Sequence, residues 1–136
     1  MFQYLDNALA INWLNLGTIS STTTVTGADL INAVGPVALT VKAASGGSGT
    51  VALQPVMSTD NASWVNVPAD SILDPTTGLQ TTFSNIVGAT GSTQTVYLKR
   101  DEMMRYVSLT LTPVVAFSAT VAVVEEHLRS YTSTTV

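Results

Sequence analysis

The chain has 136 residues, of which 46% are hydrophobic and 10% are charged, and its formal net charge is −4. This length is typical of one domain, and the hydrophobic fraction supports a complete core rather than a disordered chain. Because nucleic-acid binding relies on Lys and Arg to neutralise phosphates, 5 basic against 9 acidic residues argue against a nucleic-acid partner. There is no cysteine, which excludes disulfides, thiolate metal sites and a cysteine nucleophile.

The first residues and the longest apolar stretch indicate no targeting segment. Residues 1–6 lack the basic start and the apolar run of a secretory signal, and residues 1–8 are interpreted as an N-terminal arm. The apolar stretch at 114–124 is too short for a membrane-spanning helix and contains Ser118 and Thr120. We therefore expect a soluble protein without a membrane partner.

Turn residues at short intervals predict an all-β, single-domain antiparallel sandwich of about eight or nine strands. In the first two-thirds of the chain, strands are expected at 9–16, 18–26, 37–42, 50–57, 64–67 and 79–86. Residues 29–33 are interpreted as a short helical turn. The glycine-rich run at 45–49 predicts a hairpin, because glycine tolerates the positive φ of tight turns. Pro55 suggests an edge strand or a bulge.

The last third of the chain holds the most regular alternation. Strands are expected at 95–99, 105–112 and 117–124, the first two forming a hairpin. Val107, Leu109 and Leu111 alternate with polar residues, and successive side chains leave a strand on opposite sides, so these three are expected in the core. Residues 125–136 are charged and then rich in Ser and Thr, and they are interpreted as a C-terminal tail outside a sandwich at 1–124.

The outward-facing positions of these strands carry Thr, Ser, Ala and Tyr, and hardly any charge. Ordinary soluble domains are about 25% charged. Hydroxyl and methyl groups are cheaper to remove from water than the charged groups of Lys or Glu. The surface is therefore better suited to being covered by neighbouring subunits than to standing alone, which indicates an assembly protein.

The chain offers few groups for catalysis or metal binding. His127 is the only histidine, and Glu125 and Glu126 are too close to it along the chain to form a triad with a nucleophile. Asp70 and Asp74 have the oxygen ligands that calcium prefers, but solvated turn aspartates are the commoner case. We expect no enzymatic activity, no cofactor and no metal.

One dense charge cluster and two tryptophans remain open to two interpretations. The cluster is either a solvated hairpin tip or a contact with a partner subunit, in which the two methionines supply adaptable apolar area. The candidate interface residues, with two from the predicted tail, are Lys99, Arg100, Asp101, Glu102, Met103, Met104, Leu128 and Tyr131. Trp13 and Trp64 are interpreted either as core residues, the commoner case, or as platforms that stack on sugars.

Two segments resemble the small jelly-roll cement proteins of tailed bacteriophages, of the cementing-protein type found in Bordetella phages. The first is 51–60 (Val-Ala-Leu-Gln-Pro-Val-Met-Ser-Thr-Asp) followed by 64–67 (Trp-Val-Asn-Val), and the second is 105–109 (Arg-Tyr-Val-Ser-Leu). The resemblance covers about residues 9–124 by strand pattern. The residues from 125 onward and the sparse charge depart from it.

The resemblance implies a jelly-roll decoration protein that forms homotrimers on the outer capsid surface and clamps adjacent major capsid subunits. Such a protein is made in the cytoplasm of the host bacterium, becomes part of the virion and has no catalytic residues. The Arg-Tyr-Val strand is also similar to discoidin-type sandwiches. A carbohydrate-binding accessory for host recognition, or a head or tail completion protein, therefore remains an alternative.

Overall fold

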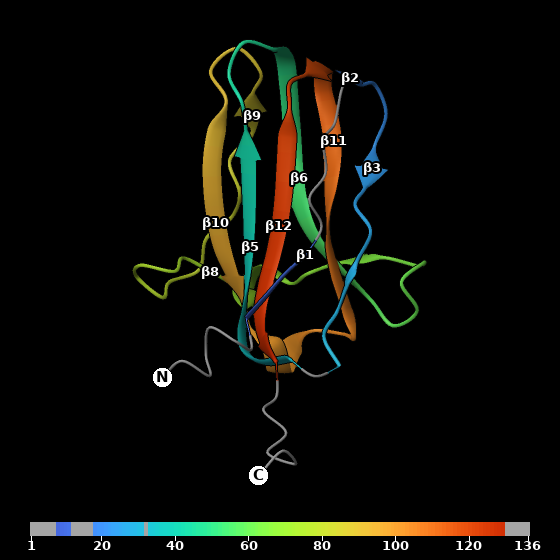
Figure 1. The fold of residues 1–136 in the computed structure, drawn as a ribbon, viewed down its shortest axis with the longest axis vertical. Coiled ribbons are helices and arrows are strands. Elements are labelled where there is room, and N and C mark those ends of the chain that lie inside the picture. The colour runs from blue at the N-terminus through green and yellow to red at the C-terminus, as the bar shows by residue number, and fades with distance from the viewer. Residues whose placement is uncertain (1–7, 12–17, 32, 130–136) are drawn as a thin grey trace.

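The computed structural model describes residues 8–11, 18–31 and 33–129, the first four and the last three by backbone alone. Two antiparallel sheets pack face to face, which confirms the predicted all-β sandwich (Figure 1). The helical segments of the described residues are two single 3-10 turns, η1 (Ala69–Ser71) and η2 (Arg100–Glu102).

The sheets are named here after their central strands, β5 and β6. The β5 sheet contains, in spatial order, β1 (Ala8–Ile11), β12 (Val121–Arg129), β5 (Ala33–Ala43), β10 (Ser92–Leu98) and β8 (Ile72–Leu73). The β6 sheet is built on β11 (Tyr106–Ser118) and β6 (Ser48–Ser58). Its outer segments are β2 (Thr18–Ile19), β3 (Thr23–Thr24) and β4 (Ala28–Asp29) along β11, and β7 (Val65–Asn66) and β9 (Ile86–Val87) along β6.

The described residues thus form twelve strands, not eight or nine, because the outer strands of the β6 sheet are broken into short segments. β2, β3 and β4 together line one edge of β11, and β7 and β9 together line one edge of β6, so each set is counted here as one strand. Apart from the short edge strand β8, the sandwich then has eight strands in chain order. The first then pairs with the eighth, the second with the seventh, the third with the sixth and the fourth with the fifth. The chain is therefore one long antiparallel double strand rolled into a sandwich, which is a jelly-roll topology.

Both predicted hairpins are wrong, because each turn joins one sheet to the other. β5 pairs with β12 and β10, so residues 45–49 carry the chain from the β5 sheet to the β6 sheet. The crossing is tight: a Cβ on Gly47 would lie 1.5 Å from the carbonyl oxygen of Ser118. Likewise, residues 99–105 connect β10 to β11 across the sandwich. Alternation reveals which face a side chain occupies but not which strand lies beside it.

The predicted C-terminal tail is wrong in its first five residues. β12 continues through Arg129, and residues 125–129 pair with β5 on one side, while residues 125–128 pair with β1 on the other. Glu125 faces inward and is fully buried. The two adjacent glutamates suggested a solvated segment, whereas one of them points into the core. Residues 130–136 lie outside the described part.

The predicted helical turn at 29–33 is also wrong. Asp29 ends β4 and its Oδ1 accepts a hydrogen bond from the Ile31 amide at 3.0 Å, while the Ala33 amide donates to the Leu30 carbonyl at 2.9 Å. This single turn leads directly into β5. The strand expected at 79–86 is reduced to a bridge at Gln80 and to β9, and of the strand expected at 9–16 the structure describes Ala8–Ile11.

The core lies between the sheets, and its facing agrees with the alternation in the sequence. Val107, Leu109 and Leu111 are fully buried, as predicted. Ser108 faces the other way yet is also buried, next to residues 24–28, which run alongside β11, and the Val25 carbonyl accepts a hydrogen bond from its hydroxyl. Burial of each of the three aliphatic side chains contributes about 1.5–3 kcal/mol to the free energy of unfolding.

Pro55 lies in the central strand β6, one residue beyond its pairing with β7. Its carbonyl accepts a hydrogen bond from the Val67 amide at 3.0 Å, just beyond β7. In a strand, the N and the carbonyl of one residue point to the same side. The absent N–H of Pro55 therefore points to the side of β6 that lies between β7 and β9. β6 is nevertheless neither an edge strand nor bulged at Pro55, because β11 pairs with it in unbroken register there and β7 and β9 flank its other side, so this prediction is wrong.

Candidate functional site: the charge-poor half

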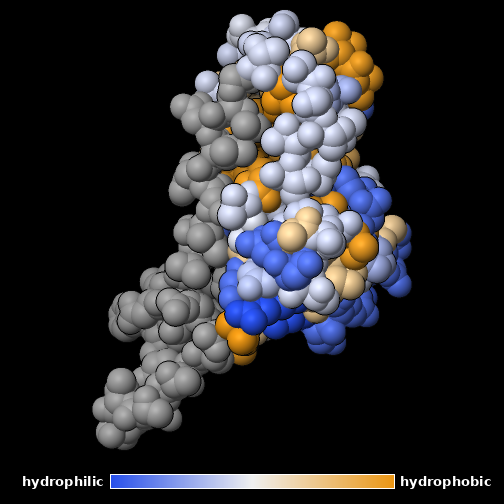
Figure 2. Space-filling view, turned by 90° about the vertical axis from the view of Figure 1, so that its right-hand side faces the viewer, coloured by the Kyte–Doolittle hydropathy of each residue, from blue (hydrophilic) through white to orange (hydrophobic). Residues whose placement is uncertain are grey.

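The strand register divides the sandwich into two halves of very different charge. One end is formed by residues 18–24, 40–54, 86–95 and 110–124, and Lys42 is the only charged residue in these segments. We call this end the charge-poor half, and the rest of the described chain the charge-rich half. Figure 2 shows the division: strongly hydrophilic atoms gather in the lower part, while pale and hydrophobic atoms cover the upper part.

Hydroxyl groups on the outer strand faces of the charge-poor half bond to one another. Thr24 and Thr110 are joined across β3 and β11 at 2.9 Å, and Thr40 and Thr95 across β5 and β10 at 2.9 Å. A hydroxyl that already has a protein partner loses less when water is removed from it. These pairs therefore lower the desolvation cost of covering the surface, beyond what the absence of charge achieves.

Exposed valines are the main apolar feature of this half. Val87, Val114 and Val115 are 45%, 62% and 59% exposed. Two register shifts place extra residues in β11 after Pro113 and after Val115, so the strand departs from strict alternation and turns neighbouring valines toward solvent. Phe117 then returns to the core, fully buried. These valines were not among the interface residues predicted from the sequence, although the break in alternation after Pro113 was a visible signal.

The predicted interface cluster at 99–104 lies at the opposite end, around η2, and much of it is committed to internal contacts. Glu102 accepts a hydrogen bond from the Ser71 hydroxyl at 2.5 Å and lies 3.9 Å from the Lys99 ammonium. Arg100 donates to the Leu30 carbonyl at 2.7 Å. Asp101 is exposed. These contacts tie η2 to η1 and to the turn before β5.

The two methionines do not form the exposed apolar area that was expected. Met103 is buried in the core, and Met104 is half-buried and packs against it. Leu128 pairs through its backbone with Val34 and Ala8, which places it at the same end as η2. Tyr131 lies outside the described residues. The structure thus brings most of the predicted cluster to one end of the sandwich. There its residues connect η2 to η1 and to the turn before β5, and we call this group of contacts the Lys99–Glu102 joint.

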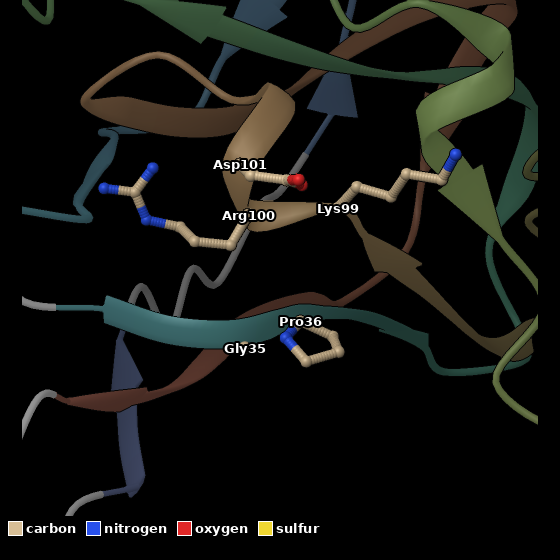
Figure 3. A pocket seen from close by; sticks show the side chains of 5 residues that line it. All are labelled: Gly35, Pro36, Lys99, Arg100 and Asp101. Atoms are coloured by element: carbon tan, nitrogen blue, oxygen red, sulfur yellow. The ribbon is translucent and has the colours of Figure 1, made fainter.

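A shallow hollow of about 480 Å³ lies beside this joint and is lined by Gly35, Pro36, Lys99, Arg100 and Asp101 (Figure 3). It forms because Gly35 and Pro36 bulge out of β5 where its pairing with β12 shifts register. In Figure 3 the Lys99 and Arg100 side chains extend in opposite directions. Their charges do not converge on one point, so the hollow lacks the geometry of an anion site.

The other candidate residues, where they are described, are placed by packing or by hydrogen bonds within the chain. Trp64 is half-buried rather than a core residue, and it lies directly against Gly27, where a Cβ would be 2.4 Å from the indole Cη2. Asp74 accepts amide hydrogen bonds from Thr76 and Thr77, as a turn aspartate does, whereas Asp70 is an exposed residue of η1. The backbone of His127 belongs to β12. Trp13 falls outside the described residues.

Among the described residues, no group of three or more His, Asp or Glu side chains is placed to hold a metal ion. Nor does that part of the chain contain a helix long and apolar enough to cross a membrane. Comparison with known proteins gives no matching family model, no matching curated protein and no matching solved structure. The charge-poor half is the candidate site on its own geometry, as an almost uncharged surface with exposed valines.

Proposed function

We propose that the chain is a non-enzymatic virion protein that decorates a phage capsid from outside and stabilises the lattice of the major capsid protein. The observation that carries this proposal is the separation of charge: the charge-poor half has one charged residue and three exposed valines. The charged remainder suits exposure to solvent. A molecule divided in this way is adapted to be embedded at one end in an assembly.

The physical basis of cementing is linkage. A protein that binds the assembled shell, and not its separated subunits, shifts the equilibrium toward the shell. Each contact can be weak, because a lattice repeats it many times and multivalency multiplies the effect. A surface of Thr, Ser, Ala and Val supplies such contacts at low desolvation cost. In this proposal the decoration protein associates with itself, as a homotrimer, and with the major capsid protein.

The jelly-roll topology and the resemblance in residues 51–67 and 105–109 support the same conclusion, since jelly rolls are common in viral capsid proteins. Lectins also use this fold. The half-buried Trp64 keeps a glycan-binding role testable as the competing outcome.

The test uses empty shells assembled from the major capsid protein of the phage that carries this gene. We expect the wild-type protein to sediment with shells at a saturating ratio and to raise the temperature at which shells come apart in calorimetry. Trp64→Ala should bind shells like the wild type. Failure to bind shells, together with binding to a glycan array that Trp64→Ala abolishes, would replace the cement proposal with the glycan one.

A further inference from the structure

Two exposed valines of the charge-poor half, Val87 and Val115, lie in one row across the β6 sheet, on either side of Thr50. Thr50 of β6 is in register with Val87 of β9 on one side and with Val115 of β11 on the other. Residues directly opposite in an antiparallel sheet point to the same face. Val114, beside Val115, extends the exposed apolar area at the bulge. We call Thr50, Val87, Val114 and Val115 the valine row.

We infer that the valine row is the surface through which copies of this chain contact one another. The inference rests on the self-association included in the proposed function and names its face. The partner that binds the valine row is a second copy of the chain. Two features favour this partner: the charge distribution of the molecule and the symmetry of a contact between identical chains.

Charge favours a second copy because every described acidic residue lies in the charge-rich half. The nearest charged pair along β11 is Arg105 with Asp29, beside Tyr106. Nine residues separate Tyr106 from Val115, which is about 30 Å at the rise of a strand. That is several times the screening length of about 8 Å at physiological ionic strength. Two chains of net charge −4 can therefore meet at the row without repulsion between their acidic ends.

Symmetry adds a second reason. In a homotrimer, side chains that lie close to the three-fold axis face their own copies. A charged residue at the centre would face its own copy, whereas valine and threonine face their copies without penalty. Lys42, the one charge of this half, is an exposed residue of the β5 sheet, on the other side of the sandwich. Contact at the row leaves the charge-rich end of each copy in solvent.

Sedimentation equilibrium of the full chain over a range of micromolar concentrations tests the inference. We expect the wild type to be oligomeric and Val115→Lys to shift the dissociation midpoint to at least about tenfold higher concentration, because lysine opposite a second lysine is repelled. The matched control is Val65→Lys, an exposed valine (48%) of the same sheet at its charge-rich end. It should leave the oligomer unchanged. Val87→Lys, at the other end of the valine row, gives the same comparison if Val115→Lys is unfolded by circular dichroism.

Three outcomes would overturn the inference. The wild type is monomeric throughout; Val65→Lys dissociates the oligomer as strongly as Val115→Lys; or neither row variant changes its midpoint. Shell binding is measured separately for the same proteins. If the wild type is monomeric and binds shells, and Val115→Lys does not bind them, the valine row is a contact surface for the capsid. The proposed function then stands. If the protein forms an oligomer that depends on Val115 but does not bind shells, the valine row is the contact between copies and the cement function is excluded.

Discussion

At the scale of single residues, the facing of β11 decides what each side chain contributes. Leu109 is fully buried between the sheets, whereas Thr110 faces outward and shares a hydroxyl hydrogen bond with Thr24. Neighbours in the sequence thus have unequal effects on the free energy of unfolding. The alternation in the sequence predicted this difference before the sheets were known.

We expect Leu109→Ala to lower the free energy of unfolding by about 2–5 kcal/mol, because it removes buried methyl groups and leaves a cavity. Thr110→Ala should cost about 1 kcal/mol, the net value of one neutral hydrogen bond. Chemical denaturation of both variants measures the difference. A larger effect at Thr110 would mean that the strand faces the opposite way.

Asp60 is the residue that organises the loop before Trp64. Its carboxylate accepts hydrogen bonds from the Ser63 and Ala62 amides and from the Ser58 hydroxyl, at 2.8, 2.9 and 2.8 Å. These bonds, the Ser63 amide first, lower the pKa of Asp60 below its ordinary value. Because the folded pKa lies below the unfolded one, the stabilisation is present above the unfolded pKa and is lost as pH falls through the folded pKa.

The loop should therefore loosen in acid, below about pH 4, where an unfolded aspartate takes up its proton. Asp60→Asn should remove this part of the pH dependence, since asparagine does not titrate. Trp64 fluorescence and denaturation at neutral and acid pH, compared between wild type and variant, provide the measurement. An identical loss of stability in both proteins would show that other groups govern the acid response.

At the scale of elements, β12 is the strand whose extent matters most. Its last five residues pair with β5, and four of them also pair with β1, so they hold the end of the β5 sheet together. A chain ending at Val124 loses the buried Glu125 and both sets of pairing, whereas a chain ending at Arg129 keeps every described strand.

We expect truncation after Val124 to abolish cooperative unfolding or to lower the melting temperature sharply, and truncation after Arg129 to have a far smaller effect. Circular dichroism during heating distinguishes the two proteins. Equal melting temperatures would mean that residues 125–129 add nothing to the sandwich.

At the scale of the whole molecule, the partition of charge predicts how assembly responds to salt. Salt screens interactions between exposed charges but has little effect on contacts between uncharged surfaces. If the charge-poor half makes the contacts, both self-association and shell binding should change by less than about tenfold between roughly 0.05 and 0.5 M salt. Sedimentation at both salt concentrations tests this. A steep loss of binding in high salt would instead point to the Lys99–Glu102 joint as the contact surface.

The sequence by itself determined the class of fold, the faces of the regular strands and the scarcity of surface charge. Val107, Leu109 and Leu111 are buried as expected, because a period of two depends only on which side of a strand meets water. The same reasoning explains what the sequence could not determine. Alternation carries no information about strand partners, and so both connections that cross between the sheets resembled hairpins.

Only the tertiary structure decided where the charges, valines and strand ends meet. Lys42 is the one charged residue of the charge-poor half because segments far apart in the sequence are brought to one end by the rolled double strand. Val87 and Val115 become neighbours of Thr50 through register alone. Glu125 belongs to the core because β1 and β5 flank its strand. These are consequences of long-range pairing, which depends on the whole sandwich and not on any local pattern of residues.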